Sequence, residues 1–138
     1  MEYKILNYSE GLFELNGEFE MPKDSPTEIS LMIAPVLLYK DDSDIVGLQF
    51  SLFYRTGEVD LLKYGYVATV AVKDWQSIAV NGVDASEIAS ELKDAWDAVL
   101  NYGRGSLASK TKDTQLSGLR IPDIPLEQMQ KIIRVVKL

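Results

Sequence analysis

Apolar and polar residues alternate along the first half of the chain. Such period-two stripes, rich in β-branched and aromatic residues, run through residues 28–40, 45–55 and 59–73. The connections between them, DDSD and TGE, are short and polar, so we expect neighbouring antiparallel strands. A further strand is expected over residues 3–15, with a bulge or bend at Gly11. Pro35 should mark an edge position or a bulge, because proline cannot donate to a ladder.

The second half follows a helical period. Asp84 to Glu87 match a capping box, in which Asp84 accepts from the first turn. Apolar residues then recur at three- and four-residue steps as far as Leu107, which predicts one long helix. Gly103 and Gly105 should weaken this helix and bring it to its end.

A second helix is expected at the C-terminus, where Pro125 suits a first turn and apolar positions run from Leu126 to Val136. Between the helices lies a short apolar segment interrupted by Pro122, which we call the strap (residues 119–124). The expected fold is α+β. It consists of a four-stranded antiparallel meander with the long helix, the irregular strap and the C-terminal helix on one face.

The other face of the expected sheet also carries apolar residues. They are Met32, Leu38, Phe53 and Leu61, interspersed with polar positions. Two helices cover at most one face of a sheet, so these positions predict a second face partly buried by another copy or a partner. We therefore expect a homodimer or a homotetramer.

Composition narrows the possible functions. The 138 residues fit a single domain over residues 1–138, and the formal net charge of −7 argues against nucleic acid as a partner. The first residues lack the basic and apolar regions of a signal peptide, and no apolar run approaches the ~20 residues that span a bilayer. We expect a cytoplasmic protein without membrane insertion.

Candidate reactive groups are few. The sequence has no cysteine and no histidine, which excludes thiol nucleophiles, disulfides and nearly all structural zinc sites. Four carboxylates follow the expected long helix at the spacing of a solvated face: Glu87, Glu91, Asp94 and Asp97. The DDSD turn resembles part of a calcium loop but lacks its glycine and bidentate glutamate, which favours a hairpin turn. We expect no enzyme, no metal site and no cofactor.

The strap permits two interpretations. It could pack over the long helix as core, as most apolar connections in small domains do. Alternatively, Leu119, Ile121 and Ile124 could stay partly exposed and wall an apolar groove, with Leu107 of the long helix nearby. These four residues are the candidate polypeptide-binding site.

The order of elements and two short motifs resemble the SecB family of export chaperones. Leu119 to Ile124 (LRIPDI) are similar to the apolar–proline–apolar segment before that family's terminal helix, and Arg104-Gly105 to the Arg-Gly at the end of its long helix. Two features depart from the family. NGVDASEIASEL stands where longer members carry a proline-containing aromatic segment, and the zinc-binding tail of the export proteins is absent.

The resemblance implies a holdase-type chaperone that binds non-native polypeptide in an apolar groove, for protein export or a toxin–antitoxin system. It also implies a dimer or tetramer, and SecA or an antitoxin as a further partner. The alternative is a structural or assembly subunit of a phage or a secretion apparatus, which would use the same apolar surfaces for fixed contacts and bind no client.

Overall fold

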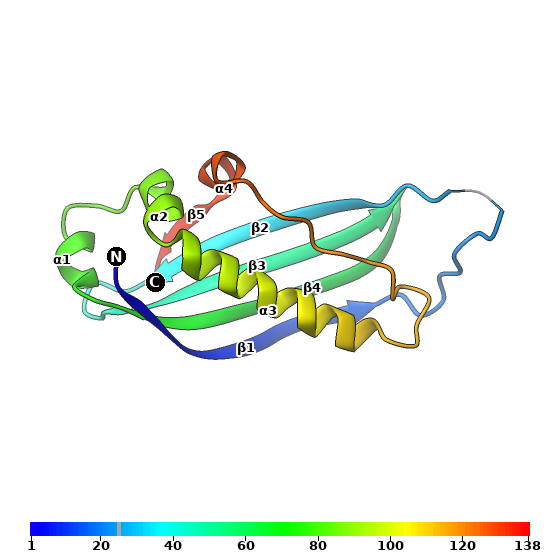
Figure 1. The fold of residues 1–138 in the computed structure, drawn as a ribbon, viewed down its shortest axis with the longest axis horizontal. Helices are drawn as coiled ribbons and strands as arrows, with labels where there is room; N and C mark the ends of the chain where they lie inside the picture. Colours follow the sequence, from blue (N-terminus) through cyan, green and yellow to red (C-terminus); the bar gives the residue numbers. More distant parts are fainter. Residues whose placement is uncertain (25) are drawn as a thin grey trace.

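A five-stranded sheet extends along the length of the molecule (Figure 1). The computed structural model describes residues 1–24 and 26–138. The strands are β1 (Tyr3–Leu15), β2 (Ser30–Tyr39), β3 (Ile45–Thr56), β4 (Val59–Val72) and β5 (Arg134–Lys137), in the order β1-β4-β3-β2-β5. The first four pair antiparallel, which confirms the three strands expected from the period-two stripes and the further strand expected over residues 3–15.

Gly11 was predicted to lie at a bulge or bend, and Pro35 at an edge or a bulge. The β1–β4 register shifts between Glu10 and Phe13, which places a bulge at Gly11. Pro35 pairs with Phe50 inside an unshifted β2–β3 ladder, so it marks an edge rather than a bulge. The partner on the other side of β2 begins to pair only at Val36.

Four helices lie between β4 and β5 in the chain: α1 (Trp75–Ala79), α2 (Ala85–Glu91), α3 (Lys93–Thr111) and α4 (Leu126–Ile132). The Asp84 carboxylate caps α2 by accepting from the Glu87 N–H at 3.1 Å, as expected. The prediction of a single long helix is wrong. The helix is interrupted at Leu92, which has φ −109° and ψ 24°. This break lets α2 contact α4 while α3 lies across β3 and β4.

The prediction that the long helix ends at Gly103 and Gly105 is also wrong. Helix α3 continues through Gly103 and Gly105 to Thr111. A Cβ at Gly103 would overlap the Tyr66 hydroxyl and lie 2.8 Å from Tyr66 Cε1. Glycine at this position therefore lets α3 approach the sheet closely and does not end the helix.

The terminal helix is shorter than its apolar pattern predicted. Ile133 is extended, with ψ 138°, and the chain continues into β5, which pairs parallel to β2. Val136 therefore lies in a strand rather than in a helix. The spacing of the apolar residues is compatible with a helix or a strand. A strand forms because the edge of β2 supplies hydrogen-bonding partners for its backbone.

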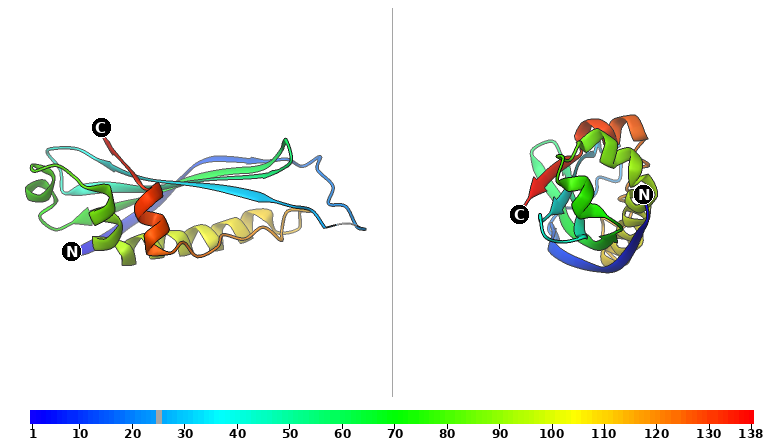
Figure 2. Two further views of the ribbon diagram at one scale, coloured as in Figure 1. Left: turned by 90° about the horizontal axis from the view of Figure 1, so that it is seen from above. Right: turned by 90° about the vertical axis from the view of Figure 1, so that its left-hand side faces the viewer.

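Helices α2, α3 and α4 and the strap all lie on one side of the sheet (Figure 2). The strand residues facing them are buried, among them Leu48, Phe50, Leu52, Tyr64 and Tyr66. Trp75 and Trp96 are also buried in this core. None of the described helices is long and apolar enough to cross a bilayer.

The opposite face of the sheet carries no helix among the described residues (Figure 2). Met32 is 61% exposed there, whereas Leu38 and Phe53 are half-buried. Leu61 was expected on this face but is buried. The β3–β4 register shifts beside Tyr54 and leaves Leu61 unpaired, and such a bulge turns a side chain toward the other face.

Candidate functional site

The strap is anchored to the sheet and to α3. Leu119 and Ile121 are each 5% exposed, so both side chains belong to the core. The Tyr54 hydroxyl donates to the Arg120 carbonyl oxygen at 2.8 Å. Burial raises the pKa of Tyr54 to about 12, so the hydroxyl remains a donor at neutral pH.

Arg104 fastens the strap from the helix side. Its Nε donates to the Ile121 carbonyl oxygen at 2.9 Å, and its Nη2 lies 2.7 Å from Asp123 Oδ1. Its Nη1 donates to Asn101 Oδ1 at 2.6 Å. The guanidinium thereby links α3 to both the backbone and a side chain of the strap region.

A cleft opens where α3, the strap and α4 meet. Its apolar end is lined by Phe50, Ala89, Lys93, Trp96, Asp97, Leu100, Ile124, Leu126 and Met129. Its polar end is lined by Lys93, Asp97, Leu100, Asn101, Arg104, Asp123 and Ile124. The shared lining residues show that the two ends are adjacent parts of one surface, which we call the α3–α4 cleft.

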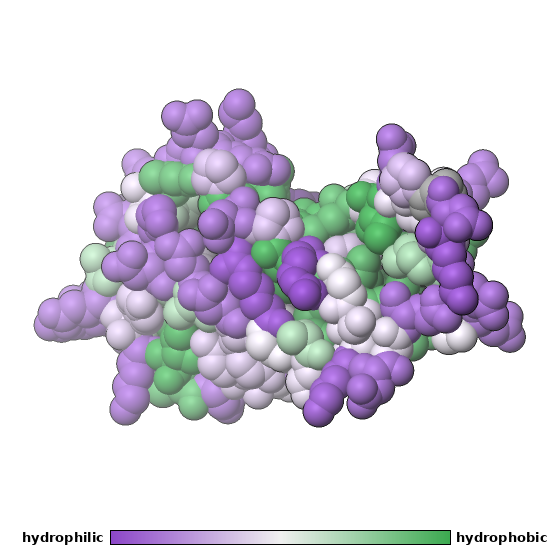
Figure 3. All heavy atoms as spheres, turned by 45° about the vertical axis from the view of Figure 1, so that its right-hand side comes forward, coloured by the Kyte–Doolittle hydropathy of each residue, from purple (hydrophilic) through white to green (hydrophobic). Residues whose placement is uncertain are grey.

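The charged residues of the cleft are already partly paired. Lys93 Nζ lies 2.7 Å from Asp97 Oδ2, one helical turn away, and the pair is about half exposed. The indole N–H of Trp96 has no acceptor within the described part of the chain. Hydrophobic surface on the face shown in Figure 3 forms separate patches bordered by hydrophilic side chains. The cleft is thus a narrow, mixed surface rather than a broad apolar plate.

The four site residues expected from the sequence are not equally accessible. Leu107, Leu119 and Ile121 are buried, so for Leu119 and Ile121 the structure agrees with the interpretation of the strap as core and not with partial exposure. Leu119 and Ile121 face the interior because hydrogen bonds from Tyr54 and Arg104 hold the strap against the sheet and α3. Ile124 is half-buried and is the only one of the four that lines the α3–α4 cleft among the described residues.

Sequence reasoning missed most residues of the cleft, among them the helix residues Trp96, Leu100, Leu126 and Met129. Their helical spacing marks them as apolar positions of two helices. Spacing alone does not say whether two such faces meet or leave a cleft between them. The one usable signal was Pro125, which starts α4 immediately after the strap.

A second polar cluster lies on the opposite flank of α3. Glu10 of β1 accepts hydrogen bonds from Ser106 Oγ at 2.6 Å and Tyr64 Oη at 2.9 Å, and its Oε2 lies 2.7 Å from Lys110 Nζ. The bond to Lys110, followed by that to Ser106, lowers the pKa of Glu10 to about 2. Burial raises the pKa of Tyr64. The contacts of Glu10 join β1 to α3, and neither the lowered pKa of Glu10 nor the raised pKa of Tyr64 lies near neutral pH.

The DDSD turn has local structural roles. Asp41 Oδ2 lies 2.6 Å from Lys137 Nζ, and Asp44 Oδ1 accepts from the Gln76 N–H at 2.9 Å. The Ser43 hydroxyl accepts from the Ile45 N–H. These contacts are those of a hairpin turn that also ties β5 and α1 to the sheet.

Comparisons with known proteins identify the fold. No family model matches the chain, and no curated protein matches it in sequence. Among solved structures, a SecB-like chaperone of Mycobacterium tuberculosis, in complex with a ChAD peptide from the HigA1 antitoxin, superposes with a TM-score of 0.61. The two are 11% identical, and the match covers 88% of this chain and 90% of that chain. The chain therefore has a divergent SecB-like fold, which confirms the resemblance at the level of architecture.

Proposed function

We propose that this chain is a holdase-type chaperone, a single SecB-like domain over residues 1–138 that binds non-native polypeptide. The observation that carries the proposal is the α3–α4 cleft, where Ile124 and Leu126 remain half-buried beside the strap on a SecB-like fold. Holding a client unfolded lowers its rate of folding or aggregation by mass action. Binding of this kind requires neither a nucleotide nor a metal ion.

Each side chain of the site has a distinct part in this proposal. Ile124, with Leu126, is half-buried at the cleft and contacts the client, gaining about 25 cal/mol for each Å² of apolar surface removed from water. Leu107 of α3 and the strap residues Leu119 and Ile121 are buried and belong to the core. The polar end of the cleft offers donors and acceptors to the client backbone.

The solved neighbour suggests the class of client. That chaperone binds a peptide from an antitoxin. By analogy, an antitoxin segment is the first partner to test for this chain, and export clients with SecA are the second. The protein would act as a homodimer or homotetramer, which explains the exposed apolar residues on the outer face of the sheet.

The same outer face supports a second candidate function, that of a structural or assembly subunit without clients. Leu6, Leu12, Met32 and Ile45 are each more than two-fifths exposed. A subunit of a phage or secretion apparatus would bury these residues in permanent contacts. It would show no protection of unfolded proteins.

The substitutions Ile124→Ser and Ile121→Ser test the client-binding role. Ile124→Ser should lower the free energy of unfolding by about 1 kcal/mol, because the side chain is only half-buried. Ile121→Ser should cost on the order of 3 kcal/mol or more through a cavity and an unpaired hydroxyl. Urea midpoints measure both, and light scattering by diluted, denatured citrate synthase measures protection of a client.

The expected result is that Ile124→Ser weakens protection although the protein remains folded. Val80→Ser is the matched control, since Val80 is 79% exposed and does not line the cleft. Equal protection by Ile124→Ser and Val80→Ser would contradict the role of the cleft. Absence of protection by the wild-type chain would favour the assembly subunit instead.

A further inference from the structure

The apolar end of the α3–α4 cleft is too narrow for a client side chain. Its free space amounts to about 10 Å³, which is room for about one water molecule. The polar end is wider, at about 270 Å³, but only Leu100 and Ile124 among its lining residues are apolar. Burial of apolar client side chains in the cleft therefore requires one of its walls to move.

Two of the three walls are fixed. Helix α3 lies close against the sheet at Gly103, and the Tyr66 hydroxyl donates to the Val99 carbonyl oxygen at 3.0 Å. The strap is held by hydrogen bonds from Tyr54 and Arg104 to two of its carbonyl oxygens. Neither of these walls can move without breaking the contacts that attach it to the rest of the protein.

The third wall, α4, is short and weakly held. It has 7 residues, and Met129 is its one buried residue. One side-chain hydrogen bond joins α4 to the rest of the described chain, from Gln130 Nε2 to the Ser86 carbonyl oxygen at 3.4 Å. Figure 1 shows α4 at the rim of the molecule, between the strap and β5. The position of α4 therefore depends on β5, which follows it directly after Ile133.

Strand β5 is itself attached to the sheet by few contacts. Of its 4 residues, Val135 is half-buried and the other three are exposed. The Leu138 N–H donates to the Tyr39 carbonyl oxygen at 2.8 Å, and Lys137 Nζ lies 2.6 Å from Asp41 Oδ2. Both partners of this ion pair are more than half exposed, so it contributes little stability. A short edge strand with so little buried surface opens locally more readily than a central strand.

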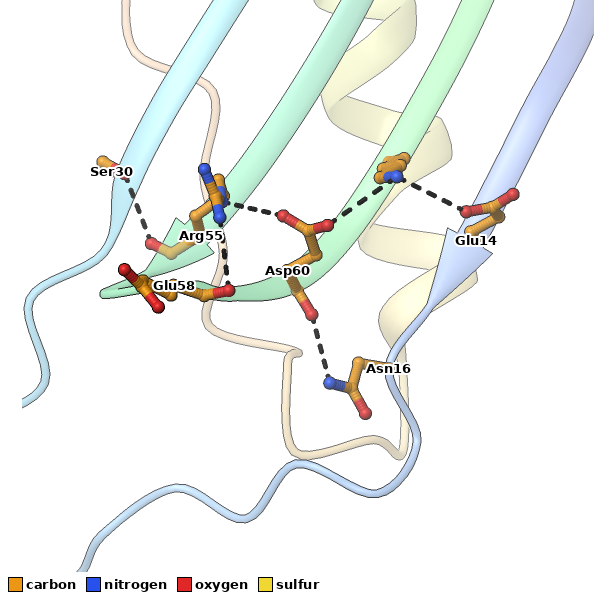
Figure 4. Close-up of polar contacts among 7 residues, drawn as sticks. Glu14, Asn16, Ser30, Arg55, Glu58 and Asp60 are labelled. Carbon is orange, nitrogen blue, oxygen red and sulfur yellow. Dashed lines mark hydrogen bonds and ion pairs between the residues drawn. The ribbon is translucent and has the colours of Figure 1, made fainter.

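The other edge strand, β1, is held much more firmly. It has 13 residues and pairs with β4 along its length. Just past its end, Asn16 Nδ2 donates to the Asp60 carbonyl oxygen at 3.1 Å. Lys63 Nζ lies 4.0 Å from Glu14 and 3.7 Å from Asp60 (Figure 4). Glu10 joins the same strand to α3. Strand β5 has no comparable network among the described residues.

The segment that forms β5 has a second conformation available. Val136 is 37% exposed in the strand, yet it continues the apolar stripe of α4 through Met129 and Ile133 at steps of four and three residues. Continuing α4 through this segment would turn Val136 toward the same face as these two residues. The sequence is thus compatible with a strand bound to β2 and with a helix detached from it.

We propose that β5 is a latch for the α3–α4 cleft. While β5 pairs with β2, α4 is held beside α2 and the apolar end of the cleft is closed. When β5 detaches, α4 moves and the cleft admits apolar side chains. This inference rests on the proposed chaperone function and states how its site becomes accessible. A client that binds only the open state shifts the population toward the detached strand.

Amide hydrogen exchange of the full chain tests the latch directly. The N–H groups of Leu138 and Val136 face β2, because Leu138 bonds to Tyr39 and this direction repeats at every second residue of a strand. Both should exchange at least about tenfold faster than the amides that pair β3 with β4. Reduced, carboxymethylated α-lactalbumin serves as the unfolded client. Adding it should speed exchange at Val136 by about threefold or more, because it favours the detached state.

A disulfide between β5 and β2 provides the second test, and the absence of cysteine from the sequence simplifies it. Leu38 and Val136 are register partners, and neighbouring strands lie about 4.8 Å apart, within the reach of a disulfide. Leu38→Cys with Val136→Cys should bind labelled α-lactalbumin at least about tenfold more weakly when oxidised than after reduction, measured by fluorescence anisotropy. Met32→Cys with Phe53→Cys is the matched control, because it links β2 to β3, which stay paired in both states.

Proline substitutions loosen the latch without a crosslink. Val136→Pro removes an N–H that faces β2, so the open state becomes more populated and affinity for the client should rise by about threefold or more. Lys137→Pro is the control, since the N–H of Lys137 faces away from β2. It also removes the exposed ion pair to Asp41 and should change affinity by less than about twofold.

The outcomes separate the latch from the proposed function. Equal client binding by the oxidised and reduced cysteine pair, or no gain in affinity from Val136→Pro, overturns the latch and leaves the chaperone function standing. Exchange at Val136 and Leu138 as slow as within β3 also overturns it, and that measurement needs no client. A wild-type chain that binds no α-lactalbumin and protects no citrate synthase overturns the latch and the proposed function together. Should Val136→Pro unfold the protein, the cysteine pair still decides.

Discussion

The close approach of α3 to the sheet depends on one glycine, and Gly103→Ala tests it. The new Cβ would overlap the Tyr66 hydroxyl and lie 2.8 Å from Tyr66 Cε1. The Tyr66 ring is 2% exposed, and its hydroxyl donates to the Val99 carbonyl oxygen at 3.0 Å, so it has little freedom to move.

The expected cost follows from three contributions. Overpacking of a filled core costs about 1–3 kcal/mol, and a displaced, unpaired buried hydroxyl about 1–3 kcal/mol. Replacing glycine by alanine inside a helix returns about 1 kcal/mol. Gly103→Ala should therefore lower the free energy of unfolding by about 3 kcal/mol, measured from urea midpoints with an unchanged slope.

Gly105→Ala is the matched control, since a Cβ there meets nothing within 4 Å. It should raise the free energy of unfolding by about 1 kcal/mol through helix propensity alone. In a Tyr66→Phe background the penalty of Gly103→Ala should shrink, because the hydroxyl oxygen is the nearest obstacle. Similar effects of Gly103→Ala and Gly105→Ala would refute the reasoning.

Two further changes test contacts that hold other elements in place. The pKa of Glu10 is lowered from 4.5 to about 2, so its ionised form stabilises the fold fully above about pH 4.5, and this contribution is lost as pH falls toward 2. Glu10→Gln should flatten the decline of the urea midpoint over that window, and an unchanged decline would show that other groups cause it. Tyr54→Phe should cost about 1 kcal/mol, because it removes the hydrogen bond to the Arg120 carbonyl oxygen. No loss in thermal or urea stability would mean that this bond does not anchor the strap.

Much of the sheet could be predicted from local pattern. The period-two stripes located β2 to β4 and identified most of their buried face, because alternation determines both the element and the side on which each residue lies, and β1 was expected as a further strand. The bulge at Gly11 and the cap at Asp84 were also predictable, since each depends on a few adjacent residues. The SecB-like order of elements followed from these strands and the helical second half.

The candidate site was less accessible to sequence reasoning. The strap was recognised as an apolar segment, but its composition could not distinguish a groove wall from core. Its position depends on contacts with Tyr54 and Arg104. Tyr54 lies in β3, far from the strap in the chain, and Arg104 lies in the preceding helix α3. The α3–α4 cleft likewise depends on where α4 lies relative to α3.

By itself, the sequence determined strands β1 to β4, most of their inner face and the helical character of much of the second half, because each depends on a pattern over neighbouring residues. Tertiary structure alone decided that Gly103 lies inside a helix, that Ile121 is buried and that Val136 belongs to a strand. The physical reason is the same in all three cases. Each outcome depends on a partner distant in sequence: Tyr66 against Gly103, Arg104 on the strap, and the β2 edge beside β5.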